Sequence, residues 1–244
     1  AEHKNRRDKP KKKHALMFYD ISSLFNKQPL DKVAKKYLGK QKEYTGKYQN
    51  KQFCFLEEHL TRLFDSLRWY KIKIPQIDFE AELKRLMKIN RFLESRIRIV
   101  VSQNGELDIQ CQKLAIDKTP RTIKIFAERR KNLGIYQHKC QNLPNVELNK
   151  QAKQDGFDDY LFIDEKERIL ETTFCNIFFV KDNEIFTPPS YLPILPGIMR
   201  AKILEQNNVS EREIFLNEIS QFDEIFVTNA IHGRVEVKEI IMGV

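Results

Sequence analysis

The sequence predicts an α+β fold divided into two domains. Helical and strand patterns follow one another in short segments, without the regular β-α-β alternation of a doubly wound parallel sheet. The chain has 244 residues, of which 41% are hydrophobic, and this is enough to build the cores of two modest domains. Residues 113–121 contain Pro120 and little pattern, so they are the best candidate for a linker. We expect a small N-terminal domain at 17–116 and a larger domain at 117–244.

Residues 1–16 are predicted to form a basic, disordered leader. They hold seven of the 43 Lys and Arg residues and two of the 34 Asp and Glu residues, so they supply +5 of the net charge of +9. A polar segment of this kind cannot bury apolar surface. A nucleic-acid-binding arm is one alternative, and a chain start at Met17 is another. Aromatic residues elsewhere do not interleave with a basic stripe, so nucleic acid is not expected as a partner.

Two helices are predicted in the N-terminal domain. Residues 18–50 are rich in Lys and Tyr and indicate only short strands and turns. Between residues 55 and 67, apolar side chains recur at helical spacing, and Pro75 ends that segment. Asp78 is a good N-cap for the second helix, because its carboxylate can accept from a free N–H of the first turn.

Most of the remaining pattern indicates short strands. Residues 95–102 alternate between apolar and polar side chains, as in a strand with one wet face, and Asn104-Gly105 predicts the turn into the next strand. Helices are predicted from about residue 142 to 154, ended by Gly156, and from about Ile198. The predicted strands span residues 95–102, 107–111, 122–126, 160–163, 176–180, 184–186, 224–228 and 235–241.

Composition argues against several classes of protein. There is no run of 18 or more apolar residues, so no membrane-spanning helix is predicted, and no apolar segment typical of a secretory signal is visible. The four cysteines form no CxxC pair, which favours reduced thiols in the cytoplasm over disulfides or zinc. The five histidines are not grouped at ligand spacing, so no metal is expected.

Two segments are candidates for binding an anion. In the first, Glu57-Glu58-His59-Leu60-Thr61-Arg62, a helix places His59 and Arg62 one turn apart, and a guanidinium can donate two parallel hydrogen bonds to a phosphate. In the second, Pro196-Gly197 opens a helix whose first N–H groups are free to bind an anion. A solvated or Glu-paired arginine is the commoner explanation of the first pattern, and an ordinary Gly-initiated helix explains the second equally well, so both alternatives stay open.

Two further segments carry a candidate carboxylate and a candidate amine. Glu171 enters an apolar run, where a buried carboxylate needs a cation such as a pyridinium nitrogen; otherwise it is a surface residue at a strand end. Lys139 precedes the helix predicted from residue 142, and a lysine with a lowered pKa reacts with aldehydes. Composition cannot distinguish this lysine from the others, whereas the order of motifs along the chain does.

Taken in order, these segments resemble the class IV aminotransferase family, enzymes of fold type IV that use pyridoxal 5′-phosphate (PLP). The match spans residues 47–238 and consists of five short motifs: EHLxR at 58–62, KxxN at 139–142, ETTxxN at 171–176, PGIMR at 196–200 and TNA at 228–230. The resemblance implies a small N-terminal α/β domain and a larger, barrel-like C-terminal α/β domain. It also implies that PLP binds at their junction and that a second subunit completes the cleft, as a homodimer.

The resemblance implies a role for each motif. Lys139 would hold PLP as a Schiff base and then shuttle a proton, while Glu171 would keep the pyridine nitrogen protonated so that the ring accepts electrons. Thr45 is the candidate contact with the substrate. The residues expected to bind the cofactor with Lys139 and Glu171 are Arg62, Gly197, Ile198, Met199, Thr228 and Asn229.

The sequence departs from the family pattern at three places. Counting back from Arg62 places Glu43-Tyr44-Thr45 where the family has a glycine-rich FET-type strand, and only Thr45 fits. Pro144 stands where branched-chain aminotransferases carry a tyrosine, and Gln103 stands where lyase relatives carry an arginine. These departures concern the recognition of the substrate carboxylate more than the binding of PLP.

Within the family, the TNA motif is more similar to aminodeoxychorismate lyases than to branched-chain aminotransferases. The resemblance therefore implies a cytoplasmic lyase of folate biosynthesis, which converts the small molecule 4-amino-4-deoxychorismate to 4-aminobenzoate and pyruvate. The nearest alternative is a branched-chain or D-amino-acid aminotransferase with the same Lys139 and Glu171. An inactive scaffold is a third hypothesis, which the pairing of these two residues argues against.

Overall fold

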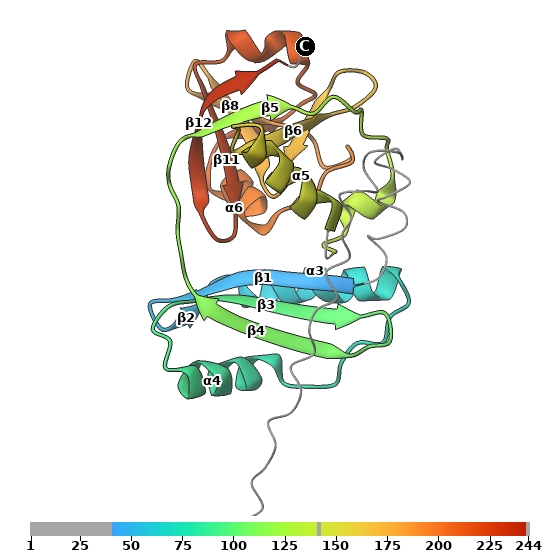
Figure 1. Ribbon diagram of the computed structural model, residues 1–244, viewed down its shortest axis with the longest axis vertical. Helices are drawn as coiled ribbons and strands as arrows, with labels where there is room; N and C mark the ends of the chain where they lie inside the picture. The colour runs from blue at the N-terminus through green and yellow to red at the C-terminus, as the bar shows by residue number, and fades with distance from the viewer. Residues whose placement is uncertain (1–40, 141–142, 243–244) are drawn as a thin grey trace, which may run out of the picture.

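The computed structural model describes residues 41–140 and 143–242, which form two bodies, each built on its own sheet (Figure 1). The smaller body holds a four-stranded sheet in the order β2-β1-β3-β4. All neighbouring strands in it are antiparallel. Its elements are β1 (Gln41–Gln49), β2 (Gln52–Phe53), α3 (Leu56–Trp69), α4 (Phe79–Asn90), β3 (Ser95–Ser102) and β4 (Leu107–Lys113).

The two faces of the small sheet differ in polarity. Ile97, Ile99 and Val101 alternate along β3 on the face that packs against α3 and α4, and Tyr44 of β1 joins the same core. Because strand side chains alternate between faces, Glu43, Thr45 and Arg98 lie on the opposite face. The small sheet therefore has one apolar face for its core and one polar face.

The larger body is a barrel-like sheet. Its strand order is β10-β9-β8-β11-β12-β5-β6-β7, and an additional pairing of β7 with β8 closes a ring of six strands. The side chains inside include Ile123, Leu161, Ile177, Phe179 and Val227, all buried. The strands are β5 (Arg121–Ile125), β6 (Asp159–Ile163), β7 (Ile169–Thr172), β8 (Asn176–Lys181), β9 (Glu184–Thr187), β10 (Val209–Glu211), β11 (Glu224–Asn229) and β12 (Gly233–Ile241).

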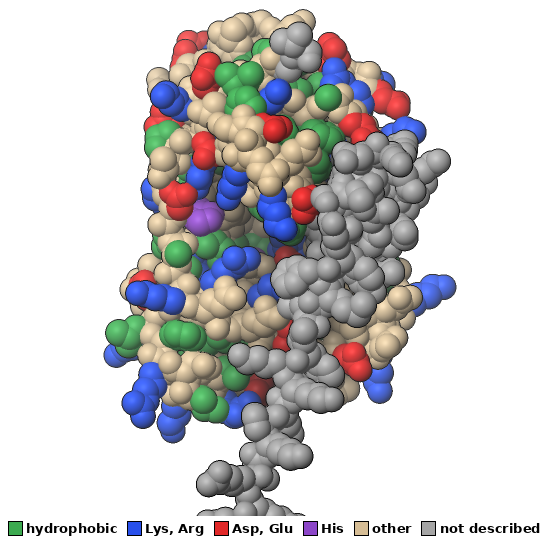
Figure 2. All heavy atoms as spheres, in the orientation of Figure 1, with side chains coloured by type: hydrophobic (Ala, Val, Ile, Leu, Met, Phe, Trp, Pro, Cys, Tyr) green, Lys and Arg blue, Asp and Glu red, His purple; other side chains and the backbone are tan. Residues whose placement is uncertain are grey.

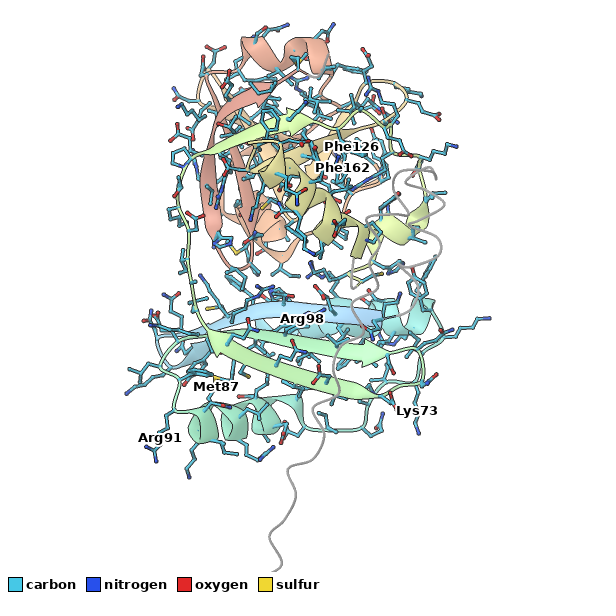
Figure 3. All side chains as sticks on the ribbon, in the orientation of Figure 1. Lys73, Met87, Arg91, Arg98, Phe126 and Phe162 are labelled. Atoms are coloured by element: carbon cyan, nitrogen blue, oxygen red, sulfur yellow. The ribbon has the colours of Figure 1, made fainter. Side chains whose placement is uncertain are left out.

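Two α-helices accompany this sheet, α5 (Leu143–Gln154) and α6 (Ile198–Gln206), with short 3-10 turns at Gly134–Gln137 and Leu216–Gln221. Leu148 and Ala152 of α5 pack against Phe162 of β6. Phe126 meets Phe162 edge to face beside this helix, with 5.9 Å between ring centroids (Figure 3).

The α+β fold class is confirmed, including the barrel-like second sheet. The helix predicted from Asp78 is confirmed as α4, and the Asp78 carboxylate accepts from the N–H of Ala81 at 2.9 Å. The interpretation of residues 41–49 as short strands and turns is wrong, because they form the single strand β1. Its buried positions include Lys42 and Gly46, which hide the alternation that identifies a half-buried strand.

Several predictions are not tested by these residues. The basic leader at 1–16 and the interpretation of residues 18–40 lie outside the described ranges. No strand or helix occurs between Lys113 and Arg121, but the division into domains at this stretch stays a prediction. Among the described helices, none combines the length and the apolar character that crossing a membrane requires.

Candidate active site

Lys139 lies at the junction of the two bodies, where β1 holds its backbone. The N–H of Glu43 donates to the carbonyl oxygen of Lys139 at 3.2 Å, and Lys42 forms an isolated β-bridge with Cys140. The Lys139 side chain is 21% exposed, and its Nζ lies 3.7 Å from Oε1 of Glu43. The amine is therefore confined rather than free in solvent. On the face drawn in Figure 2, Lys and Arg side chains gather along the boundary between the bodies.

Glu171 is a buried carboxylate with three partners. Its Oε1 accepts from Nη1 of Arg130 at 2.8 Å, while its Oε2 accepts from the N–H of Leu195 at 3.0 Å and from Nδ2 of Asn176 at 3.3 Å. Burial raises the pKa of the Glu171 carboxyl, and the charges of Arg130 and Lys139 oppose the rise. The charge of Lys139 is thus among the groups that lower the pKa of Glu171, after the charge and hydrogen bond of Arg130 and the N–H of Leu195.

Strand register brings two further motif residues beside Glu171. Glu171 of β7 pairs with Asn176 of β8, and Asn176 pairs with Thr228 of β11. The Oγ1 of Thr228 is buried and has no hydrogen-bond partner within the described residues. A buried hydroxyl without a partner is costly unless a ligand satisfies it. Thr228 therefore fits the predicted contact with a phosphate.

The start of α6 lies against the same place. Gly197 is the N-cap, and its carbonyl accepts from the N–H of Ala201 at 2.9 Å. A Cβ at Gly197 would lie 2.1 Å from Oδ1 of Asn176, so only glycine allows this close approach. The first N–H groups of the helix, including those of Ile198 and Met199, have no acceptor within the helix and can bind an anion.

Arg62 joins α3 to this anion site. Its Nη1 donates to the carbonyl oxygen of Pro196 at 3.1 Å, directly before Gly197. Burial lowers the pKa of the Arg62 guanidinium to about 10, and the Glu43 carboxylate opposes this change. Contacts thus link Arg62, Gly197 and Asn176 at the place where the sequence predicts that a phosphate binds.

His59, the other polar residue singled out on this helix, does not share the position of Arg62 at the anion site. It is buried, and its ring meets the Tyr44 ring edge to face at 4.8 Å between centroids. Burial, and after it the charges of Arg62 and Lys139, lower the pKa of His59 to about 3, so the ring is uncharged at neutral pH.

A polar wall, which we define as Glu43, Thr45 and Arg98, lies on the small sheet opposite Lys139. Nε and Nη2 of Arg98 donate to Oε2 of Glu43 at 3.0 and 2.8 Å, and Oγ1 of Thr45 donates to Oε1 at 3.3 Å. Thr45, the predicted substrate contact, thus lies beside the residue that faces the amine. Gln103 lies in the exposed turn between β3 and β4.

The Asn229 side chain stabilises the turn that follows β11. Its Oδ1 accepts from the N–H groups of Ile231 and His232 at 3.0 and 2.8 Å, and its Nδ2 contacts Sγ of Cys175 at 3.1 Å. The side chain thus fixes the end of β11 and the position of Thr228. A direct contact between Asn229 and the cofactor stays a prediction.

The residues brought together fit PLP. A confined amine can bind its aldehyde, a buried carboxylate can meet its ring nitrogen, and an arginine, a helix N-terminus and the unsatisfied Thr228 hydroxyl can hold its phosphate. No group of three or more His, Cys, Asp or Glu side chains that could bind a metal occurs in residues 41–140 and 143–242.

Comparison with known proteins identifies the family. The model of the family "Amino-transferase class IV" matches residues 45–240. A putative branched-chain-amino-acid aminotransferase from Methanocaldococcus jannaschii is 31% identical over 214 residues, 76% of this chain and 73% of that protein. A probable branched-chain-amino-acid aminotransferase from Rickettsia bellii is 32% identical over 219 residues, 79% of this chain and 74% of that protein.

A solved structure from Legionella pneumophila, described as a putative 4-amino-4-deoxychorismate lyase, is 26% identical with a TM-score of 0.78, covering 83% of this chain and 84% of that one. The chain therefore belongs to the class IV aminotransferase family. It is a PLP-dependent enzyme that acts on small molecules.

Sequence reasoning missed Arg130 and the Glu43–Arg98 pair. Arg130 is 1% exposed, and its guanidinium also lies over the Phe162 ring at 3.9 Å. The prediction that a buried Glu171 needs a cation is confirmed, but the cation in this structure is the guanidinium of Arg130 and not a pyridinium nitrogen. The sequence alone could not single out Arg130 as the partner of Glu171, because the adjacent Arg129 is also an arginine and nothing local distinguishes the two.

Proposed function

We propose that this enzyme is a lyase that converts 4-amino-4-deoxychorismate to 4-aminobenzoate and pyruvate. The observation that carries the proposal is the polar wall opposite Lys139. An aliphatic side chain of a branched-chain amino acid would bind weakly to this wall. The ion pair and the hydroxyl would lose bound water and gain no hydrogen bond in return. A substrate with carboxylates and an ether oxygen suits this surface better.

We assign the chain's residues the following roles. Lys139 binds the cofactor and then removes the proton from the carbon that bears the substrate amine. Glu171 would bind the ring nitrogen, and Arg62, Thr228 and the N–H groups of Ile198 and Met199 would hold the phosphate. When bound, PLP supplies an electron sink for the electrons left by that proton. Loss of the enolpyruvyl ether then gives the aromatic amine and pyruvate, with no amino acceptor required.

The second candidate is an aminotransferase for branched-chain or D-amino acids. The relatives from M. jannaschii and R. bellii, named as branched-chain aminotransferases, support it at 31% and 32% identity. The same lysine could return a proton to a different atom and so complete an amino transfer to a keto acid. The two candidates differ in the substrate surface and share the cofactor site.

One comparison of activities separates these candidates. Purified enzyme with PLP is given 4-amino-4-deoxychorismate, and pyruvate and 4-aminobenzoate are measured. In parallel, transfer of the amino group from L-leucine and from D-alanine to 2-oxoglutarate is measured. The proposal predicts equal amounts of pyruvate and 4-aminobenzoate, and faster turnover than with either amino acid. Amino transfer without pyruvate release would establish the aminotransferase instead.

We also propose a cytoplasmic homodimer. All four cysteines lie within the described residues and are free, which supports a reducing compartment. The second subunit is proposed from the family resemblance, and light scattering of the purified protein at micromolar concentration tests it. A mass of one chain would contradict the dimer.

A further inference from the structure

We propose that Lys47 and Arg96 form a second anion subsite, which binds the carboxylate that the substrate carries across its ring from the amine. The inference rests on the proposed lyase function, because 4-amino-4-deoxychorismate has two carboxylates, whereas a branched-chain amino acid has one. The two residues then select a dicarboxylic substrate over a monocarboxylic one.

Strand register places Lys47 and Arg96 directly opposite each other. Lys47 of β1 pairs with Arg96 of β3, and the pair of Thr45 with Arg98 lies two residues away. Because strand side chains alternate between faces, both pairs lie on the polar face of the small sheet, together with Glu43. Lys47 and Arg96 therefore extend the polar wall along β1, to a point roughly 13 Å from Glu43 at the usual rise of a strand.

This pair of cations is unfavourable for the sheet itself. Like charges directly opposite each other on neighbouring strands are destabilising. Arg98 is neutralised by Glu43 at 2.8 Å, but neither Lys47 nor Arg96 has a carboxylate within ion-pair distance among residues 41–140 and 143–242. The other neighbour of Arg96 across the sheet is the uncharged Gln112 of β4. Proteins break such local rules mainly at functional sites, so the pair indicates a binding role.

The larger body adds positive charge at the same place, beside the linker that crosses from β4 to β5 (Figure 1). Burial lowers the pKa of Lys118 in this linker, and the charge of Lys47 lowers it further. Burial and the charge of Arg121 lower the pKa of His232, and the charge of Arg96 adds to this fall. Cations from both bodies thus lie close enough to repel one another.

A carboxylate in this linker, Asp117, is engaged elsewhere. One of its oxygens accepts from Nη2 of Arg121 at 2.6 Å, and the other accepts from a backbone N–H at 2.9 Å. Asp117 therefore offsets the charge of Arg121 and leaves those of Lys47 and Arg96 for a ligand. Lys47 is half-buried and Arg96 is exposed, so both side chains are accessible.

The turn after β11 connects this subsite to the predicted phosphate site. Oδ1 of Asn229 accepts from the N–H of His232 at 2.8 Å, and Nδ1 of His232 accepts from the N–H of Asp117 at 3.0 Å. Asn229 directly follows Thr228, whose buried hydroxyl has no partner within the described residues. These contacts hold the linker and the predicted cofactor site in a fixed relation.

The shape of the substrate fits this arrangement. Its amine must reach the cofactor that Lys139 holds, and the Lys139 backbone is bonded to Glu43, at one end of the polar wall. The enolpyruvyl ether is attached beside the carbon that bears the amine, so its carboxylate stays near that end. The ring carboxylate points away, toward Lys47 and Arg96. A guanidinium binds a carboxylate through two parallel hydrogen bonds, and an ammonium adds another charge-assisted one.

The test compares the KM for 4-amino-4-deoxychorismate in Lys47→Gln, Arg96→Gln and the control Lys88→Gln. Lys88 is an exposed lysine of α4, which packs against the opposite face of the small sheet, so the control removes the same charge away from the subsite. Loss of one charge-assisted contact should raise KM about tenfold or more and change kcat little. Arg96→Lys, which keeps the charge, should retain most of the affinity.

Two further measurements separate substrate binding from effects on the fold. The product 4-aminobenzoate keeps the ring carboxylate and pyruvate carries the other, so both glutamine variants should weaken inhibition by 4-aminobenzoate and leave inhibition by pyruvate unchanged. Because Lys47 and Arg96 repel each other, removal of either charge should leave the melting temperature unchanged or raise it.

A raised KM and weaker inhibition by 4-aminobenzoate, without a lower melting temperature, would support the subsite. It would be overturned if the wild type is active and both variants match Lys88→Gln, if inhibition by pyruvate weakens instead, or if both variants melt at a lower temperature. A wild type that releases no pyruvate would contradict the proposed function separately. Calorimetric binding of chorismate, which has a hydroxyl in place of the amine, then decides: weaker binding in both variants than in the control supports the subsite, and equal or absent binding overturns it.

Discussion

Glu171 and Arg130 form the most buried ion pair described, with side chains 10% and 1% exposed. Arg130 also donates to the carbonyl oxygen of Pro193 at 3.0 Å, so it fixes the loop that leads to Gly197 as well as the carboxylate. A single arginine thus positions the predicted partner of the ring nitrogen and the approach to the phosphate site.

Arg130→Met should therefore destabilise the protein. Removal of one partner leaves a buried carboxylate unpaired, which typically costs about 3–5 kcal/mol of unfolding free energy. Urea denaturation of the cofactor-free enzyme measures this loss. Arg85→Met, which breaks an exposed pair on α4, is the control and should leave the stability almost unchanged, because exposed ion pairs contribute little. Equal stability of the two variants would contradict the structural role of Arg130.

Thr228 gives a second prediction at the scale of one residue. Since its Oγ1 has no partner among the described residues, Thr228→Val should leave the cofactor-free stability almost unchanged but weaken PLP binding by about tenfold or more. Thr187 is a matched control, because its buried Oγ1 donates to the carbonyl oxygen of Ile177 at 2.8 Å. Thr187→Val should lose stability and keep its PLP affinity, measured by absorbance titration. The opposite result would show that Thr228 is purely structural.

At the scale of elements, the predictions succeeded where a pattern is local. The apolar stripe of α3, the Asp78 cap of α4 and the alternation of β3 each depend on residues close in sequence. β7 was not predicted, because it has four residues, all buried, and thus shows no alternation. The position of Glu171 in a strand could not be recognised for that reason.

Gly197 decides how α6 begins. Gly197→Ala should displace the Asn176 side chain, since the added Cβ would lie 2.1 Å from Oδ1, and Asn176 donates to both Glu171 and the carbonyl oxygen of Leu195. We expect PLP affinity to fall by about tenfold or more, as for the loss of a charge-assisted hydrogen bond. Gly134→Ala is the control, because the nearest atom to its Cβ is 3.9 Å away. Unchanged PLP affinity in Gly197→Ala would show that the phosphate site tolerates a side chain at this position.

At the scale of the whole molecule, the site combines segments that are distant in the chain. Glu43 and Lys139 belong to different bodies, and Arg130 lies 41 residues from Glu171. Motif order predicted Lys139, Glu171 and the phosphate-binding segments as site residues, which stays a prediction, and it predicted the architecture, which is confirmed. It could not identify the polar wall or Arg130, because their partners depend on strand register and on packing between the bodies.

The central claim is that Lys139, among many lysines, binds the cofactor, and one measurement tests it directly. The enzyme is loaded with PLP, reduced with borohydride, digested, and the modified peptide is sequenced by mass spectrometry. Our account predicts that the label is on Lys139 and that Lys139→Ala prevents labelling while the protein remains folded. Lys42 is the natural competitor, since it is buried beside Cys140 and burial lowers its pKa to about 8. A label on Lys42, or labelling that persists in Lys139→Ala, would contradict the assignment.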